Sequence, residues 1–209
     1  WYPSTVATQS RVMKELILQY LVRTGDPSLI DFKLHDFGFR GVTCPEQAAL
    51  GGASHLVNFK GTDTVAGLVL ANRFYHEPCA GYSIPAAEHS TITSWGKDYE
   101  VDACRNMLLQ YPHGMVATVS DSYDVFHCCS NIWGGALKEL VLARDGVLVV
   151  RPDSGDPSTV VVKVLDILGE RFGFTANAKG FKVLNPKVRV IQGDGIDFKS
   201  LDGILSAIT

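Results

Sequence analysis

The sequence predicts an α/β protein with a mostly parallel sheet, and three observations lead to this prediction. Runs of apolar, β-branched residues alternate along the chain with polar turns and helical patterns. The expected strands are almost continuously apolar, as they are where helices cover both faces of a parallel sheet. Charged and hydroxyl side chains directly follow three of these strands. In a parallel sheet such side chains gather at one edge, where α/β proteins build their functional sites.

Two segments have the periodicity of amphipathic helices. The apolar stripe of the first consists of Val12, Met13, Leu16, Ile17, Tyr20 and Leu21, and that of the second consists of Val160, Val161, Val164, Leu165 and Leu168. Asp156 can cap the unpaired backbone donors at the start of the second helix, and Pro157 suits its first position. The opening stretch YPSTVAT instead resembles a strand already under way, so we expect the chain to be a piece of a longer one.

Three strands are expected at residues 114–119, 146–150 and 187–191. The polar residues that follow them are Ser120, Asp121 and Ser122 after the first, Arg151, Asp153 and Ser154 after the second, and Gln192, Gly193, Asp194 and Gly195 after the third. Because polar residues follow all three strands, we expect the strand ends to form a site.

A further helix is expected in SYDVFHCCSNIW, where we interpret His127, Cys128 and Cys129 as packing residues.

The composition is that of a soluble globular domain. The chain has 209 residues, of which 46% are hydrophobic and 20% charged, enough for one domain with a real core. The net charge of -3 gives no general attraction to nucleic acid or to anionic membranes, so we expect a small-molecule ligand. Five cysteines without a CxxC motif indicate a reducing compartment and neither disulfides nor zinc. No membrane span or signal peptide is visible in this sequence.

The motif RPDSGDP suits an anionic, sugar-containing ligand. Arg151 offers a planar fork of donors to phosphate or carboxylate, and Asp153 can accept from sugar hydroxyls. The helix that follows Asp156 can itself attract phosphate at its N-terminus. A salt-bridged turn with a helix cap is the alternative. In QGDGID, Gly193 and Asp194 could approach a ligand closely, although an ordinary turn is the commoner explanation.

Two motifs in the first third of the chain suit a flat ring. In HDFGFRG, Phe37 offers an apolar surface and Arg40 a cation. A core aromatic is the alternative, and we favour it for Phe39 because residues two apart on extended backbone point to opposite faces. In NFKGTDTVAG, Asp63 could be the N-cap of a helix that begins near Thr64, a ligand contact, or both.

The stretch PAAEHSTIT places His89 between Glu88 and several hydroxyls. A lone histidine is more often structural than catalytic, and the hydroxyls could simply begin a helix toward Trp95. No HxxxH or HxH pattern is present, so no metal site is expected. The remaining histidines that we considered, His55, His76 and His113, show no partner that distinguishes them.

Six blocks in a fixed order are more specific than any one motif. They are KLHDFGFRG, HLVNFKGTDTVAG, GYSIPAAEHSTITSWGKD, VSDSYD, VVRPDSGDP and VIQGDGID, and together they closely resemble the nicotinamide phosphoribosyltransferase family. The resemblance runs over essentially the whole chain but covers only the middle portion of the longer family chains. It implies the TIM-like α/β barrel of the type II phosphoribosyltransferases, incomplete at both ends, with residues 1–209 as a single core domain.

The resemblance also implies roles for individual residues. Phe37 would stack on the nicotinamide ring, Arg40 would contact phosphate or diphosphate, and Asp63 would accept from the carboxamide nitrogen. His89 would be phosphorylated by ATP and contact diphosphate, with Glu88 and Asp121 as its neighbours. Arg151 and Asp153 would contact the base, diphosphate and ribose, and Gly193 and Asp194 would hold ribose and phosphate. Within this set, His89, Asp121 and Asp153 are the expected catalytic residues.

The reaction that the resemblance implies makes nicotinamide mononucleotide and diphosphate from nicotinamide and phosphoribosyl pyrophosphate, in NAD biosynthesis. We expect the pyridine nitrogen to attack the anomeric carbon while arginines and Mg²⁺ stabilise the leaving diphosphate, with ATP as co-substrate. The residue chemistry adds that Asp63 would repel the carboxylate of nicotinic acid. The family further implies a cytoplasmic homodimer, in which the partner subunit and regions beyond this chain complete the site.

Three alternatives remain beside this interpretation. The chain could be a nicotinate phosphoribosyltransferase, and Asp63 is the feature that discriminates against it. It could be a non-catalytic nucleotide-binding protein or fragment, whose incomplete barrel would expose apolar surface. An α/β barrel of unrelated chemistry would require six ordered matches to be coincidence, and we set it aside.

Overall fold

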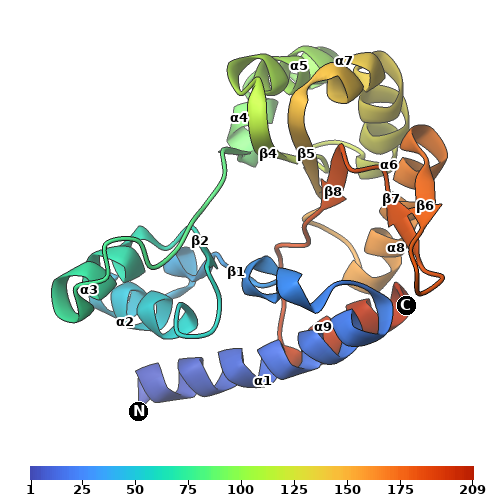
Figure 1. Ribbon diagram of the computed structural model, residues 1–209. Helices are drawn as coiled ribbons and strands as arrows, with labels where there is room; N and C mark the ends of the chain where they lie inside the picture. The colour runs from blue at the N-terminus through green and yellow to red at the C-terminus, as the bar shows by residue number, and fades with distance from the viewer. The chain divides into compact units, whose positions relative to one another are not determined.

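The structure, a computed structural model that describes residues 1–209, contains the predicted alternation of strands and helices (Figure 1). The chain divides into two compact units, Trp1–Ser83 and Ile84–Thr209. Its largest sheet is entirely parallel, so the predicted α/β class with a parallel sheet is confirmed. None of the helices combines the length with the apolar character that crossing a bilayer requires.

The first unit is mostly helical. Its helical segments are α1 (Tyr2–Thr24), η1 (Pro27–Phe32), η2 (Gly38–Gly41), α2 (Pro45–His55) and α3 (Val65–Tyr75). Two short strands, β1 (His35–Asp36) and β2 (Gly61–Thr62), pair in parallel. Tyr82 forms a further parallel bridge beside Gly61. This small parallel arrangement fixes the backbone that precedes Phe37, Asp63 and Ser83.

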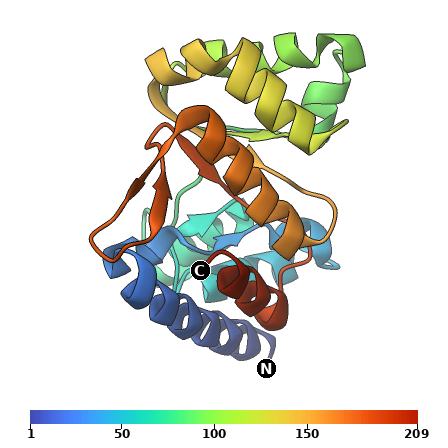
Figure 2. The ribbon, with the colours of Figure 1, turned by 90° about the vertical axis from the view of Figure 1, so that its right-hand side faces the viewer.

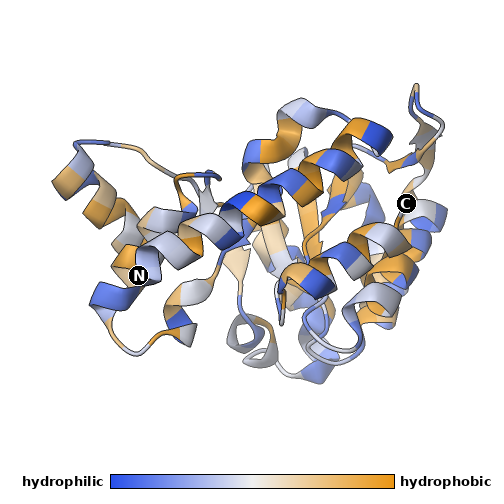
Figure 3. Cartoon of the chain, turned by 90° about the horizontal axis from the view of Figure 1, so that it is seen from below, coloured by the Kyte–Doolittle hydropathy of each residue, from blue (hydrophilic) through white to orange (hydrophobic).

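The expected strand at the N-terminus is wrong, because α1 begins at Tyr2. Pro3 lies in the first turn, where its missing N–H costs no hydrogen bond, and the apolar periodicity behind it outweighs the local β-like composition. Ile17 is buried while Val12 is 47% exposed, so the helix has a buried face as predicted, but Val12 does not belong to it. Figure 3 shows hydrophobic and hydrophilic residues mixed along this helix, which starts at the N mark.

The second unit is built on a four-stranded parallel sheet. Its strands, in the order in which they pair, are β3 (Ala86–Ala87), β4 (His113–Val119), β5 (Asp145–Arg151) and β8 (Val188–Val190). Val119 lies opposite Arg151, and Leu148 lies opposite Val188. The three strands predicted from the sequence are all present, although β8 is shorter than expected.

Helical segments follow the strands of this sheet. They are α4 (His89–Thr93), η3 (Lys97–Tyr99), α5 (Glu100–Gln110), α6 (Val125–His127), η4 (Cys128–Ala136), α7 (Lys138–Ala143), α8 (Pro157–Phe172) and α9 (Phe198–Ala207). The start of α8 is as predicted, since the Asp156 carboxylate accepts from the Thr159 N–H at 2.9 Å. An antiparallel hairpin of β6 (Phe174–Ala176) and β7 (Lys182–Leu184) separates α8 from β8 (Figure 2).

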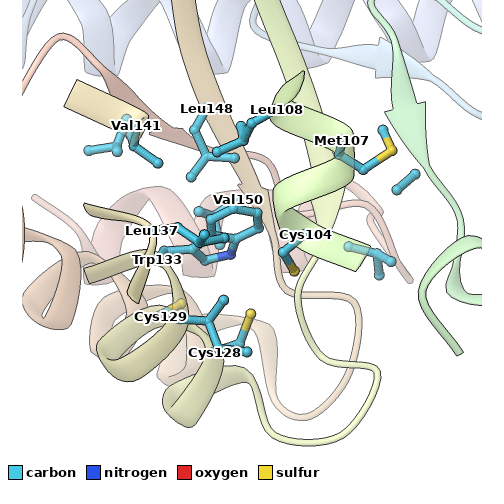
Figure 4. Close-up of a cluster of buried hydrophobic side chains, with 14 of the residues drawn as sticks. Cys104, Met107, Leu108, Cys128, Cys129, Trp133, Leu137, Val141, Leu148 and Val150 are labelled. Carbon is cyan, nitrogen blue, oxygen red and sulfur yellow. The ribbon is translucent and has the colours of Figure 1, made fainter. Parts of the chain in front are cut away.

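The core of the second unit lies between the sheet and these helices. Trp133, Leu148 and Val150 are at most 1% exposed and belong to one apolar cluster (Figure 4). The segment predicted as a helix around Cys128 is helical, but η4 has π-helical hydrogen bonding rather than an α-helical register. Cys128 and Cys129 are buried as expected. His127 is exposed, so its interpretation as a packing residue is wrong.

Candidate functional site

The carboxyl edge of the parallel sheet in the second unit gathers most of the candidate residues. Because β3, β4, β5 and β8 run in the same direction, the residues that follow them emerge at one edge. These residues are Glu88 and His89 after β3, Ser120 and Asp121 after β4, Arg151 and Asp153 at the end of β5, and Gln192, Gly193 and Asp194 after β8. The predicted strand-end cluster is therefore present in this unit.

His89 and Asp121 form a close pair. The Nε2 atom of His89 lies 3.0 Å from Asp121 Oδ1, and the carboxylate side chain is 4% exposed while the imidazole is 45% exposed. A carboxylate only accepts hydrogen bonds, so Nε2 carries the proton and the lone pair of the neutral ring is on Nδ1. A half-exposed imidazole backed by a buried carboxylate is suited to nucleophilic or proton-transfer chemistry.

The turn from β3 into α4 fixes the backbone at His89. Glu88 is the N-cap of α4, and its side chain accepts from the backbone N–H of Thr91. In return, the Thr91 hydroxyl accepts from the Glu88 N–H at 3.2 Å. This reciprocal capping box satisfies donors at the helix start and places His89 at the first helical position. The alternative considered from the sequence, that the hydroxyls begin a helix toward Trp95, is thus present as α4.

Arg151 and Asp153 form a two-pronged ion pair. Arg151 donates from Nε to Asp153 Oδ1 at 3.2 Å and from Nη2 to Oδ2 at 2.8 Å. The two side chains are 5% and 8% exposed, and Arg151 Nη1 lies 3.8 Å from the Glu88 carboxylate. A buried guanidinium requires such compensation. The salt-bridged turn considered from the sequence is therefore present, and it places an oriented carboxylate at the sheet edge.

Gly193 brings the backbone after β8 against this ion pair. A Cβ atom at residue 193 would lie 3.2 Å from Arg151 Nε and 3.4 Å from Asp153 Oδ1, which is tighter than ordinary packing contact with Arg151. Gly195 has a φ of 64°, a left-handed conformation that favours glycine. Between them, Asp194 is exposed. This loop therefore presents backbone and one carboxylate beside Arg151 and Asp153.

Asp63 is the centre of a separate cluster in the first unit. His35 Nε2 donates to Asp63 Oδ1 at 2.8 Å, and the hydroxyl of Ser83 donates to the same oxygen. The Asp63 side chain remains 37% exposed. The N-cap of α3 is Thr64, so the interpretation of Asp63 as the cap is wrong. Two donors on one carboxylate oxygen hold the group in a fixed orientation.

The ring of Phe37 lies beside this cluster. Its centroid is 4.6 Å from that of His35, with the ring planes tilted by 34°. Arg40 is exposed in the same short segment. Phe39 is 44% exposed, so its assignment to the core is wrong. The reason is that residues 38–41 form a 3₁₀ turn, whereas the prediction assumed extended backbone.

His35 and Ser83 were not predicted from the sequence. Their motifs gave no direct signal, because the partners of Asp63 come from segments 28 and 20 residues away. Gly61 was a weak sign that another segment approaches the backbone there, since a Cβ at this position would lie 2.7 Å from the His35 ring. His55 also has a partner that the sequence did not reveal, because its Nε2 lies 3.0 Å from the Gly61 carbonyl oxygen.

Comparison with known proteins gives the family. The family model for the nicotinate phosphoribosyltransferase (NAPRTase) family matches residues 32–209. Over its whole length, the chain is 57% identical to the nicotinamide phosphoribosyltransferase of Xanthomonas campestris pv. campestris, of which it covers 45%. It is 34% and 33% identical to the proteins of the same name from Mycoplasma pneumoniae and Acinetobacter baylyi, covering 47% and 45% of them.

The family model covers most of this chain. The chain spans about half the length of the curated relatives it matches. The family match nevertheless includes every candidate residue in both units, from Phe37 to Asp194. The chain therefore belongs to the nicotinate phosphoribosyltransferase (NAPRTase) family.

Proposed function

We propose that the whole protein transfers a phosphoribosyl group from phosphoribosyl pyrophosphate to nicotinamide, giving nicotinamide mononucleotide and diphosphate in NAD biosynthesis. The observation that carries this choice is the Asp63 carboxylate, which His35 and Ser83 orient through the same oxygen atom. The names of the relatives from three bacteria support the same choice.

Asp63 distinguishes the two possible bases by charge. The carboxamide of nicotinamide donates N–H groups to a carboxylate, whereas the carboxylate of nicotinic acid would meet Asp63 as a like charge. The donors from His35 and Ser83 leave the carboxylate unable to rotate away without losing hydrogen bonds. Phe37 offers its ring face to the pyridine, and Arg40 offers a cation to phosphate or diphosphate.

The second unit contributes groups for the phosphoribosyl portion. Nε and Nη2 of Arg151 are engaged by Asp153, which holds that carboxylate in place as an acceptor for a ribose hydroxyl. Nη1 of Arg151 faces the Glu88 side chain at 3.8 Å, a longer contact that an anionic substrate oxygen could replace. The backbone at Gly193 and the Asp194 carboxylate add contacts for ribose and phosphate beside this pair.

The chemistry requires no protein base. The pyridine nitrogen is already a nucleophile, and it forms a bond to the anomeric carbon as the bond from that carbon to the diphosphate oxygen breaks. Cationic side chains stabilise the charge that develops on the leaving group. When bound, Mg²⁺ would neutralise the diphosphate oxygens. No group of three or more His, Cys, Asp and Glu side chains could hold a metal, but Mg²⁺ commonly needs only one or two carboxylates with substrate phosphates. The exposed Asp194 carboxylate fits that donor set.

We also propose that His89 couples ATP to this reaction. Asp121 binds Nε2–H, so Nδ1 is the nucleophile that attacks the γ-phosphorus, with ADP as the leaving group. Asp121 then stabilises the positive charge that the ring gains. Water later hydrolyses the phosphohistidine to inorganic phosphate.

We further propose two features that the family implies: the whole protein is a homodimer, and its parallel strands belong to one α/β barrel domain.

An enzymatic assay with two competing bases tests the proposed function. The protein is incubated with phosphoribosyl pyrophosphate, Mg²⁺, ATP and equal concentrations of nicotinamide and nicotinic acid, and both mononucleotides are quantified by mass spectrometry. We expect nicotinamide mononucleotide as the dominant product. Preferential formation of nicotinic acid mononucleotide would assign the chain to nicotinate chemistry. Binding of nicotinamide mononucleotide without turnover would indicate a non-catalytic nucleotide-binding protein.

A further inference from the structure

A buried tryptophan is connected to the residue that precedes Asp121. Trp133 lies within η4 and is fully buried, as is Ser120 at the end of β4. The indole Nε1–H of Trp133 donates to the Ser120 hydroxyl oxygen at 3.1 Å. A buried indole N–H needs a partner, and a hydroxyl can accept this bond while donating its own proton elsewhere.

Ser120 makes two further hydrogen bonds. Its hydroxyl donates to the carbonyl oxygen of Thr118 at 2.9 Å. Its backbone N–H donates to the carbonyl oxygen of Arg151 at 2.9 Å, which extends the pairing of β4 with β5 beyond Val119. Three hydrogen bonds therefore fix both the backbone and the side chain of the residue next to Asp121.

The surroundings of Trp133 keep its indole in one place. Figure 4 shows Trp133 in the apolar cluster beside Leu137 and Val150. The π-helical turn continues past it, with the Leu137 N–H donating to the Ile132 carbonyl oxygen at 2.8 Å. Such wide turns in helices frequently occur at functional sites. The rigid indole can thus act as an anchor for the end of β4.

We propose that Trp133 is a positioning residue for the His89–Asp121 pair and acts through Ser120. The side chains of Ser120 and Asp121 reach different elements, since Ser120 binds Trp133 in η4 and Asp121 binds His89 in α4. Anchoring one of two adjacent residues restricts the rotation of the backbone that carries the other. Loss of the indole donor would therefore allow the Asp121 carboxylate to move from His89. This role rests on the proposed function of His89 as a phosphoryl acceptor.

Trp133→Phe and Ser120→Ala test this role, because the first removes the indole donor and the second removes its acceptor. In the full protein, we expect each substitution to lower kcat for ATP-dependent phosphorylation of His89 about tenfold, which corresponds to about 1.4 kcal/mol. We expect KM for ATP to change less than about twofold, because neither residue is placed in contact with ATP. The double variant should be no slower than the single ones, since both remove the same hydrogen bond.

Trp95→Phe is the matched control. This substitution makes the same chemical change as Trp133→Phe, but Trp95 is 43% exposed and lies outside this chain of hydrogen bonds. Wild-type kcat in Trp133→Phe and Ser120→Ala would overturn the proposal, and so would additive losses in the double variant. If Trp133→Phe does not fold, Ser120→Ala decides alone.

A readout without ATP separates failure of this proposal from failure of the proposed function. The Nε2–H proton of His89 is followed by NMR in isotope-labelled protein. We expect its resonance to move upfield and to exchange faster with solvent in Trp133→Phe and Ser120→Ala, but not in Trp95→Phe. An unchanged resonance in both variants would overturn the positioning role. A shifted resonance in a protein whose wild type does not phosphorylate His89 would support the positioning role and reject the ATP chemistry.

Discussion

His89 and Asp121 are 32 residues apart in the sequence, yet their side chains lie 3.0 Å apart at the carboxyl edge of the parallel sheet. The parallel pairing of β3 with β4 causes this approach, because Ala87 lies opposite Thr118 and both strands end within a few residues of the site. The pair defines which imidazole nitrogen is available for chemistry.

The first prediction concerns that nitrogen. Because Asp121 engages Nε2, incubation with ATP should give Nδ1-phosphohistidine at His89. Phosphorus NMR of the intact protein distinguishes the two phosphohistidine isomers. His89→Ala should give no phosphoprotein, and Asp121→Asn should slow its formation by at least about tenfold, since a charge-assisted hydrogen bond is lost. Phosphate on Nε2 would show that the hydrogen bond to Asp121 is not kept during the reaction.

The second prediction concerns the backbone at Gly193. Gly193→Ala would bring a Cβ atom within 3.2 Å of Arg151 Nε, so the ion pair with Asp153 must shift. We expect the affinity for phosphoribosyl pyrophosphate, measured by calorimetry, to fall about tenfold, or about 1.4 kcal/mol.

Gly135→Ala is the control for this substitution, because the nearest atom to its added Cβ is Ser130 O at an ordinary 3.6 Å. Equal losses of affinity in the two variants would mean that the contact at Gly193 has no particular role.

The third prediction concerns the pH dependence of stability. Burial lowers the pKa of His55, so the folded protein binds fewer protons here than the unfolded chain does. The free energy of unfolding should therefore be highest above the ordinary histidine pKa of about 6.5 and fall as the pH drops toward the lowered folded value. Urea titrations between about pH 5 and pH 8 measure this slope.

His55→Gln provides the comparison for this slope. The amide can still donate to the Gly61 carbonyl oxygen but does not titrate, so the slope should become flatter. Asp31 contributes to the pH dependence of stability in a more acidic range than His55 does. Hydrogen bonds from Lys60 and Lys14 lower its pKa, so its stabilising contribution is lost only as the pH falls below about 4. An unchanged slope in His55→Gln would contradict the burial of His55 as a neutral ring.

The fourth prediction concerns the cysteines. Cys44 and Cys79 are exposed, whereas Cys104, Cys128 and Cys129 are buried. Burial raises the pKa of Cys129 to about 12, so its reactive thiolate is scarce at neutral pH. Iodoacetamide should alkylate two cysteines in the folded protein and five after unfolding, as counted by mass spectrometry. Rapid alkylation of Cys128 or Cys129 in the folded state would contradict the packing around η4.

The sequence predicted best what depends on local chemistry. The strands around Val116 and Leu148 were visible as apolar runs, and the start of α8 was visible from Asp156 and Pro157. The polar residues behind the strands were also visible, because a parallel sheet has only one carboxyl edge. The neighbourhood of His89 and Asp121 was expected only from the family resemblance, because the two-residue strand β3 before His89 leaves no apolar run in the sequence.

The sequence failed where tertiary contacts decide. The N-terminal helix is an error of another kind, because Pro3 and a helical stripe, both local features, outweighed the β-like composition there. The partners of Asp63, His35 and Ser83, come from distant segments that only folding brings together. The π register of η4 was also invisible, because apolar periodicity over so few residues does not separate it from an α-helix. The hydrogen bond from Trp133 to Ser120 joins residues 13 apart in the sequence and was missed as well.

Calorimetric binding of nicotinamide mononucleotide and nicotinic acid mononucleotide to the wild type and to Asp63→Asn tests directly whether Asp63 selects the base. The substitution retains an oxygen that accepts from His35 and Ser83 while removing the charge. We expect the wild type to bind the amide nucleotide at least about tenfold more tightly and Asp63→Asn to lose most of this preference. Equal affinities for the two nucleotides in the wild type, or an undiminished preference in Asp63→Asn, would contradict the assignment of Asp63 as the residue that selects nicotinamide.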